Sequence, residues 1–276
     1  MNDLLRRHQA PIAPESWEAI DEQAREVLTA NLSARRVVDV SGPHGWQHAA
    51  VNLGRLDPGR VEAGNGVLYG IRKVLPLVEV RVPFTLDLWE LDDVVRGARD
   101  PDLDPLIAAA GKLAAFEERA VYHGFAPAGI VGMGQASSHD SVVLDSDAAV
   151  WPEAIGRAMI ELKSAGEGPP YTLVAGPNVF RALESVVGQY PLRRQIEQLI
   201  GGEIVLAPYV DGAFLLPEEN DQDFELVLGQ DASVGFEQQE GQNVRLYLTE
   251  SFTFRVLEPQ AVVAFTSGAP GGRVPP

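Results

Sequence analysis

The feature that most constrains the fold is a long alternating stretch near the C-terminus, residues 243–257, with the sequence NVRLYLTESFTFRVL. Side chains of a β-strand alternate between two faces, and every second residue here, from Val244 to Val256, is apolar except Glu250. As one strand the stretch would span about 50 Å, whereas ordinary strands have about five or six residues. A turn or bulge near Glu250 would divide it. An unbroken strand would suit an elongated subunit that packs against copies of itself.

The composition is that of a folded protein with one large domain or two closely joined ones. The chain has no cysteine, which excludes disulfides, thiolate nucleophiles and thiolate metal sites. Its 22 basic and 39 acidic residues give a formal net charge of −17, which argues against a nucleic-acid partner. No apolar run approaches the roughly 20 residues of a membrane helix, and the N-terminus lacks the apolar core of a signal peptide. We therefore expect a cytoplasmic protein with no membrane partner.

Two amphipathic helices are predicted in the first half of the chain. One begins at Pro14, with apolar residues at helical spacing on one face (Trp17, Ile20, Ala24, Val27, Leu28 and Leu32). That face packs on its own domain or stays partly open to a partner. The second spans residues 104–124, with Asp104 as its cap, Pro105 in its first turn and Gly124 at its end.

A long hairpin is predicted between these helices. Residues 49–56 and 67–83 are extended segments, and the separator LDPGRVEAGNG has the composition of a hairpin tip. The arms mix Arg, Lys and Glu among Val and Leu, so they contain few residues suited to a core. Isolated hairpins are marginal in water. We therefore expect this one to pack on a neighbouring subunit.

Strand and helix patterns alternate over residues 150–217, which predicts a small mixed α/β domain inserted into the larger one. Helical patterns at WPEAIGRAMIELKSAG, PNVFRALESVV and LRRQIEQLIGG alternate with strand patterns at YTLVAG, EIVLAP and GAFLLP. After Phe265 the tail has few apolar residues, so residues 266–276 are expected to be flexible.

The sequence contains weak candidates for catalytic or metal chemistry only. His44 and His48 have a helical metal spacing, but the surrounding SGP and GWQ argue against a helix. Ser138, His139 and Asp140 are adjacent and cannot converge as a triad must. A glycine-rich loop near residue 132 lacks the preceding strand and following Lys of a phosphate site, and Glu117 and Glu118 point in different directions on their helix. We expect no catalytic residue, no metal site and no cofactor.

Several co-linear blocks resemble one family. They are RRHQAPIAPESWEAIDEQARE, RRVVDVSGPHGW, RVPFTLDLWELDD, GPPYTLV, LVLGQDASVGF and LYLTESFTFRVLEP. Together they run from about Leu4 to Phe265 and resemble the encapsulins, the linocin-type shell proteins that share the fold of tailed-phage capsids. No single block would be specific, whereas the ordered set is.

The resemblance implies an α+β fold of the Hong Kong 97-type phage major capsid class. Its parts would be an N-terminal helix and the start of the peripheral domain (1–48), an extended loop (49–80), the peripheral domain with its spine helix (81–125), an axial domain (126–222), the long peripheral strands (223–265) and a flexible tail (266–276). Copies would close into an icosahedral shell, and the smallest such shell is favoured because the chain lacks large insertions.

The resemblance also implies two sites. A C-terminal targeting peptide of a cargo enzyme would dock between the N-terminal helix and the peripheral domain, at Leu28, Leu32, Arg35, Asp39, Val234 and Phe236. Aliphatic side chains would form its trough, and one cation and one anion would fix the direction of the peptide. The alternative is that Leu28 and Leu32 are only core residues.

The second implied site is a pore at the fivefold axes. Its loop would comprise Glu184, Ser185, Val186, Val187, Gly188, Gln189 and Tyr190. An acidic residue repeated around an axis makes a charged ring that favours cations such as iron. The alternative is an ordinary turn between two helices.

The predicted function is therefore a self-assembling encapsulin shell that encloses a ferritin-like protein or a dye-decolourising peroxidase. A role in iron storage or oxidative stress would follow from such a cargo. One alternative is a phage or prophage major capsid protein that packages DNA, which the acidic charge opposes. Another is an enzyme such as a protease, for which the residues provide no site.

Overall fold

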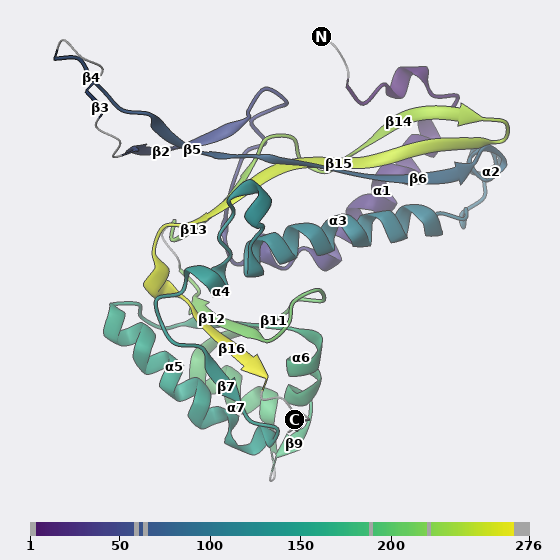
Figure 1. The fold of residues 1–276 in the computed structure, drawn as a ribbon. Coiled ribbons are helices and arrows are strands. Elements are labelled where there is room, and N and C mark those ends of the chain that lie inside the picture. Colours follow the sequence, from purple (N-terminus) through teal and green to yellow (C-terminus); the bar gives the residue numbers. More distant parts are fainter. Residues whose placement is uncertain (1–3, 58–60, 63–65, 188–189, 220–221, 268–276) are drawn as a thin grey trace, which may run out of the picture.

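The computed structural model describes residues 4–57, 61–62, 66–187, 190–219 and 222–267. Two separate sheets organise these residues, and Figure 1 shows the long strands of the first sheet lying above the mixed α/β part built on the second. A thin hairpin projects from the end of the long strands that lies opposite α2 (Leu88–Arg96). The molecule is thus elongated, with two sheets that share one apolar cluster between them and one projecting arm.

The first sheet is built around one long central strand, β15 (Asn243–Val256). Strand β6 (Val78–Asp87) pairs with β15 in antiparallel fashion from Asn243 to Phe252. On the other edge, β14 (Ser233–Glu240) and β13 (Phe224–Leu228) follow one another along β15, and β1 (Asp39–Ser41) is parallel to β13. The long alternating stretch is therefore one uninterrupted strand, about 45 Å long.

Glu250 does not break this strand. It pairs in register with Val80 of β6, and its side chain is 1% exposed. A buried carboxylate is tolerated where polar or charged partners surround it. The cation that pairs with Glu250 is an arginine, described with the site below.

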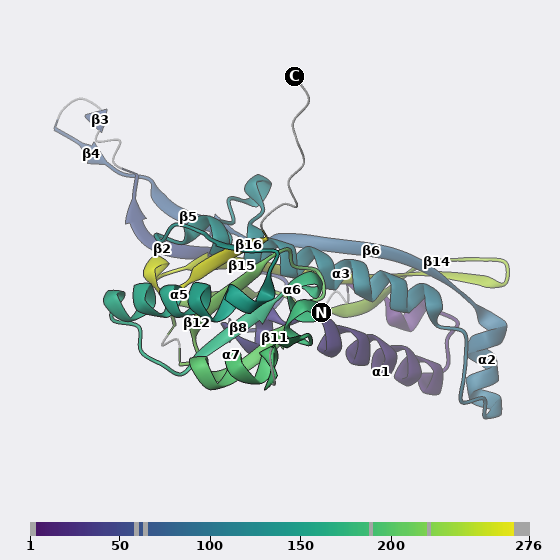
Figure 2. The same ribbon diagram turned by 90° about the horizontal axis from the view of Figure 1, so that it is seen from below.

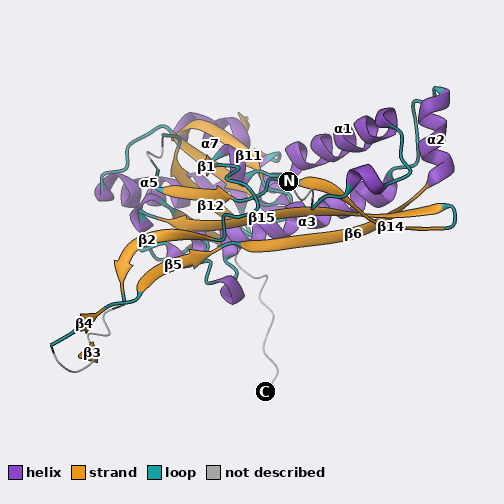
Figure 3. Ribbon diagram, turned by 90° about the horizontal axis from the view of Figure 1, so that it is seen from above, coloured by secondary structure: helices purple, strands orange, loops and turns teal. Residues whose placement is uncertain are grey.

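Two long helices cover one face of this sheet, as Figures 2 and 3 show. Helix α1 (Pro14–Asn31) packs on α3 (Asp104–His123), and α3 packs on β6 and β15. Ile20, Leu106 and Leu246 are fully buried between them. Asp104 is the first residue of α3 and gives no side-chain cap, because Leu103 occupies the capping position, so that prediction was wrong. Gly124 follows the helix with a positive φ, as predicted.

The second sheet has the strand order β11, β8, β12, β16, β7. Its core includes Trp151, Leu173, Ile196, Leu215 and Val263. The elements of this part are α4 (Met133–Ala136), β7 (Val142–Leu144), α5 (Trp151–Ala165), β8 (Tyr171–Ala175), α6 (Pro177–Leu183), β9 (Val186–Val187), β10 (Tyr190–Pro191), α7 (Leu192–Ile200), β11 (Gly201–Leu206), β12 (Ala213–Pro217) and β16 (Val263–Ser267). The predicted helix PNVFRALESVV is shorter than expected and ends at Leu183, after which the chain forms the small β9–β10 pair.

The projecting hairpin is made by β2 (Ala50–Leu56) with β5 (Arg72–Pro76) and, further out, β3 (Val61–Glu62) with β4 (Leu68–Tyr69). Its apolar side chains are largely exposed, including Leu56, Leu68, Tyr69, Ile71 and Val74. The exposed fractions of Leu68 and Ile71 are 73% and 66%. The hairpin therefore buries little of its own apolar surface within one chain.

The strand pairing places two of the predicted domain boundaries differently, one near residue 80 and one near residue 265. Residues 78–80, assigned to the extended loop, are the first residues of β6 and pair with β15. Strand β16, assigned partly to the long strands and partly to the tail, pairs with β12 and β7 of the second sheet. The 3₁₀ turn η5 (Pro259–Ala261) separates β15 from β16, so the chain leaves one sheet and enters the other. The tail prediction from residue 268 onward lies outside the described residues.

Four further 3₁₀ turns connect the main elements. They are η1 (Arg7–Gln9), η2 (Ala34–Arg36), η3 (Ala126–Ala128) and η4 (Ala148–Val150). Two of them matter for the site, because η1 precedes α1 and η2 follows it. Arg7 of η1 pairs with Asp21 of α1, and η2 is bonded to Glu117 and Glu118 of α3, so both ends of α1 are fixed.

Candidate functional site

A groove of about 540 Å³ lies between α1, the turn η2 and the first residues of β14. Its floor is aliphatic and includes Leu28, Leu32, Val234 and Leu248. These side chains are at most 8% exposed and belong to the core between α1, α3 and the first sheet. Polar side chains of α1, η2 and the loop before β14 form its rim. The arrangement offers an apolar surface with charged groups at its edges, as a peptide-binding groove requires.

The N-terminal segment forms one wall of this groove through Leu5. The Phe236 backbone N–H donates to the Leu5 carbonyl at 2.8 Å, and the Tyr247 hydroxyl donates to the Leu4 carbonyl at 2.7 Å. The Tyr247 ring passes over Gly235 to reach the Leu4 carbonyl, and a Cβ added to Gly235 would lie 2.4 Å from that ring. A glycine is therefore required at this position of β14 for the tyrosine to hold the segment.

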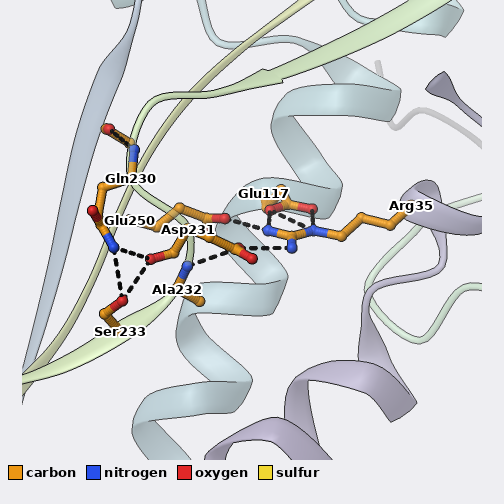
Figure 4. A network of polar contacts seen from close by, with 8 residues as sticks. Arg35, Glu117, Gln230, Asp231, Ala232, Ser233 and Glu250 are labelled. Atoms are coloured by element: carbon orange, nitrogen blue, oxygen red, sulfur yellow. Dashed lines mark hydrogen bonds and ion pairs between the residues drawn. The ribbon is translucent and has the colours of Figure 1, made fainter. Parts of the chain in front are cut away.

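A buried charge cluster lies at the η2 end of the groove (Figure 4). The Arg35 guanidinium donates to Glu117 through Nε at 3.0 Å and Nη2 at 2.6 Å, to Asp231 through Nη1 at 2.9 Å, and to Glu250 through Nη2. Glu117 and Glu250 are almost fully buried, whereas Asp231 is half-exposed. One cation thus joins η2, α3, β15 and the loop before β14.

The cluster holds more carboxylates than cations, and the pKa values reflect this. Burial raises the pKa of Glu250 well above its ordinary range; the charge of Glu117 acts in the same direction, and Arg35 opposes both. Burial by itself would lower the pKa of Arg35, but the hydrogen bond and charge of Glu117, with Glu250 and Asp231, raise it above its ordinary value. Arg35 therefore stays charged, and Glu250 keeps a proton to higher pH than a carboxyl in water does.

Glu118, the neighbour of Glu117, binds a different part of the same turn. Its Oε1 accepts from the Ala34 N–H at 2.8 Å, and its Oε2 accepts from the Ser33 hydroxyl. The Tyr122 hydroxyl lies 3.1 Å from the Ser33 Oγ. Burial raises the pKa of Glu118 to about 7, although both hydrogen bonds lower it. The two adjacent glutamates therefore anchor η2 to α3 at two points.

The raised pKa of Glu118 predicts a pH-dependent stability. The folded chain holds this proton up to about pH 7, whereas the unfolded chain releases it near pH 4.5, so the folded state binds more protons between those values. The free energy of unfolding should fall as pH rises through this window, by at most about 3.5 kcal/mol. Glu118→Gln, which mimics the protonated acid, should reduce this fall in denaturant titrations at pH 5 and pH 8. An equal pH dependence in both proteins would contradict the assignment; Glu250 would contribute a residual slope of the same sign.

The weak chemical candidates do not gather into a catalytic or metal site. No group of three or more His, Cys, Asp or Glu side chains is placed to hold a metal within the described ranges. The rings of His44 and His48 lie 4.8 Å apart, with His44 Nε2 3.0 Å from the Ser41 hydroxyl. His139 Nε2 contacts the Gln260 carbonyl rather than Ser138. None of the helices in the described part of the chain is long and apolar enough to cross a membrane.

Comparison with known proteins decides the family. Residues 1–253 match the family described as encapsulating protein for peroxidase. The chain is 44% identical over 270 residues to the type 1 encapsulin shell protein of Rhodospirillum rubrum. The aligned residues cover 95% of this chain and 96% of the relative. The chain belongs to the encapsulin family of shell proteins. The resemblance of its sequence blocks to encapsulins is thereby confirmed.

The fold of this encapsulin agrees with that assignment. It is similar to the virus-like particle protein from Pyrococcus furiosus, with a TM-score of 0.63, 16% identity and coverage of 90% of this chain and 98% of that chain. It is similar to the capsid protein of Myoviridae phage XM1, with a TM-score of 0.52, 12% identity and coverage of 86% and 92%. The predicted α+β fold of the Hong Kong 97-type phage capsid is confirmed. This encapsulin is a structural shell protein, like its named relatives, and not an enzyme.

Four of the six residues expected at the cargo site line the groove of this encapsulin. They are Leu28, Leu32, Arg35 and Val234. Asp39 lies in β1, opposite Glu225 of β13, and does not reach the groove, while Phe236 is buried beneath the N-terminal segment that its N–H binds. Leu28 and Leu32 both line the groove and belong to the core, so the two interpretations of these leucines coexist.

The pore loop expected in this encapsulin is described in part. Glu184 and Ser185 are exposed at the end of α6, and Glu184 accepts from Arg193 Nη1 at 2.8 Å. Val186, Val187 and Tyr190 lie in the β9–β10 pair, whereas Gly188 and Gln189 lie outside the described residues. Glu184 is therefore not an unpaired acid, although it shares Arg193 with Glu197, whose Oε1 accepts from Arg193 Nε at 2.9 Å.

Sequence reasoning missed the carboxylates that hold Arg35. The signal for Glu250 was present, since it is the one acidic residue in an otherwise apolar row of β15. Glu117 and Glu118 indeed point to different partners, yet nothing in their helix pattern shows that both are buried against η2. Asp231 lies 196 residues from its partner, too far for any local pattern to reveal the pair.

Proposed function

We propose that copies of this chain close into an icosahedral shell in the cytoplasm, and that the groove beside α1 holds the C-terminal tail of an enclosed cargo enzyme. The observation that carries the proposal is the groove itself: an aliphatic floor with a charged rim, on a chain whose relatives are shell proteins. The exposed apolar hairpin supports self-assembly, because a neighbouring copy would bury what one chain leaves open. The smallest icosahedral shell is favoured because the chain lacks large insertions.

The parts of the subunit take their roles from this arrangement. The first sheet with α1 and α3 would form the peripheral domain, and the hairpin near residues 49–77 would be the extended loop that lies across a neighbour. The second sheet with α5, α6 and α7 would form the axial domain that meets its copies at the symmetry axes. The apolar clusters particular to each sheet support this division, and a third cluster joins the two parts.

A peroxidase of the dye-decolourising type is the favoured cargo, with a ferritin-like protein as the second choice. The description of the matched family, encapsulating protein for peroxidase, supports the first. Either cargo would give the shell a role in oxidative stress or iron storage. Packaging of DNA is disfavoured by the net charge of −17, because a phosphate polymer requires a basic inner surface.

Leu32→Asp should abolish cargo loading while shells still close, because an unpaired charge in an apolar groove is costly. Loading is measured as cargo per shell after co-expression, and closure by electron microscopy. Leu32 is also a core residue, so Thr29→Trp provides a second variant: Thr29 is exposed, lines the groove and can be enlarged to fill it. Thr29→Ser is the matched control. Normal loading in both Leu32→Asp and Thr29→Trp shells would refute the groove as the docking site.

We also propose that the loop from Glu184 to Tyr190 lines a pore that admits cations. Glu184, Arg193 and Glu197, two acids that share one cation, would set the charge of this pore. Glu184→Lys places two cations together and should slow iron uptake into ferritin-loaded shells, whereas Glu184→Asp should change it little. Unaltered uptake in the Lys variant would argue against a pore lined by this residue.

A further inference from the structure

Four arginines line the groove, and three of them already have acidic partners. Arg35 is held by Glu117, Glu250 and Asp231. Arg7 pairs with Asp21 at 2.6 Å, and its guanidinium lies over the Trp17 ring at 4.0 Å. Arg36 pairs with Glu203 at 3.0 Å, with both side chains half-exposed. The remaining arginine is Arg25.

Arg25 is exposed on α1 and has no ion-pair or hydrogen-bond partner among the described residues. The two aspartates of the groove are already committed, Asp21 to Arg7 and Asp231 to Arg35. Arg25 is therefore the one arginine of the groove that has no acidic partner among the described residues, although the whole chain has a net charge of −17. An uncompensated cation beside an apolar floor favours a ligand that brings a single negative group.

The position of Arg25 on α1 places this charge at the end of the groove away from the Arg35 cluster. Leu28 follows Arg25 by three residues on the same face of α1, and Leu32 follows it by seven, as the residue directly after the helix end. With a rise of about 1.5 Å per residue, the backbone of Leu32 lies roughly 10 Å further along the helix. That separation corresponds to about three residues of an extended peptide.

We infer that Arg25 is the residue that selects an acidic group on the cargo tail. The inference rests on the proposed docking of that tail in this groove. An extended tail would place aliphatic side chains over Leu28, Leu32 and Val234 and a side-chain or terminal carboxylate beside Arg25. Arg35 is not assigned this role, because the three carboxylates of the chain itself hold four of its five N–H groups and surround its charge.

The test uses whole shells co-expressed with a fluorescent protein that carries a designed twelve-residue tail. In the tail, Leu and Ile alternate with Gly and Ser, and one fixed position after them is Asp, Asn or Lys. Every tail then continues into the same Gly-Ser extension, so that the terminal carboxylate lies equally far from the tested residue in all three. Fluorescence per shell measures loading. Wild-type shells should load the Asp tail about two- to fivefold better than the Asn tail, the range of one partly exposed ion pair, and the Lys tail least.

Arg25→Glu should invert this order, so that the Lys tail loads best. Arg119→Glu is the matched control, because Arg119 is an exposed arginine on α3 that does not line the groove, and it should keep the wild-type order. Equal loading of all three tails by wild-type and Arg25→Glu shells would overturn the role of Arg25 and leave docking intact. Loading of every tail no better than a tail-free fluorescent protein would overturn docking in the groove, and the inference with it.

Discussion

Replacing Leu68 and Ile71 with glutamine is expected to prevent shell closure and to leave a folded subunit. Both side chains lie on the hairpin and are about two-thirds or more exposed in the single chain, so the subunit itself loses little apolar burial. If a neighbouring copy covers them, each contributes about 1.5–3 kcal/mol to the contact. Two such losses in every subunit weaken each contact by at least about 3 kcal/mol, or more than a hundredfold. Size-exclusion chromatography and electron microscopy measure the outcome.

The control is the double variant Leu68→Met with Ile71→Val, which keeps the hairpin apolar and should form normal shells. Circular dichroism of the glutamine variant should match that of the parent chain, because none of the three apolar clusters contains a residue of the outer hairpin. Normal shells from the glutamine variant would contradict burial of these side chains against a neighbour. An unfolded variant would contradict the independence of the hairpin from the cores.

The elements that were predictable from the sequence are those whose pattern is local. Strand β15 alternates over its whole length, and α1 repeats its apolar residues at helical spacing, so each could be drawn nearly residue by residue. The hairpin was predictable for the opposite reason, because its apolar residues are too few and too mixed with charge to make a core. Each of these predictions depends on residues that are neighbours in the chain.

What could not be predicted depends on pairing between distant segments. The alternation of residues 263–267 indicates a strand but not a sheet, and the chain turns at Pro259–Ala261 to join β12 instead of continuing beside β13. The same limit applies to the site. Arg35 was expected to face a peptide, because neither Glu117 nor Asp231 reveals from its own surroundings that it lies against η2.

Arg35→Met is expected to destabilise the folded chain by about 3–5 kcal/mol, because it leaves Glu117 and Glu250 buried without a cation. Methionine keeps most of the volume of the side chain, so the loss is chiefly electrostatic. The midpoint of thermal or denaturant unfolding measures it. The triple variant Arg35→Met, Glu117→Gln, Glu250→Gln should recover most of the loss, since neutral amides need no counter-charge. Wild-type stability in the single variant would show that the cluster contributes nothing.

The triple variant also separates the structural role of Arg35 from a role in cargo binding. If Arg35 held the tail of the cargo directly, the triple variant would be stable yet would load no cargo. In the arrangement described here, Arg35 fixes η2 to α3 and β15, and the groove keeps its aliphatic floor and Arg25 when the cluster is made neutral. The triple variant should therefore load cargo close to the wild-type level. Shells of the Arg25→Glu variant, which remain stable, should load less cargo than wild-type shells. Opposite results would return the tail-binding role to Arg35.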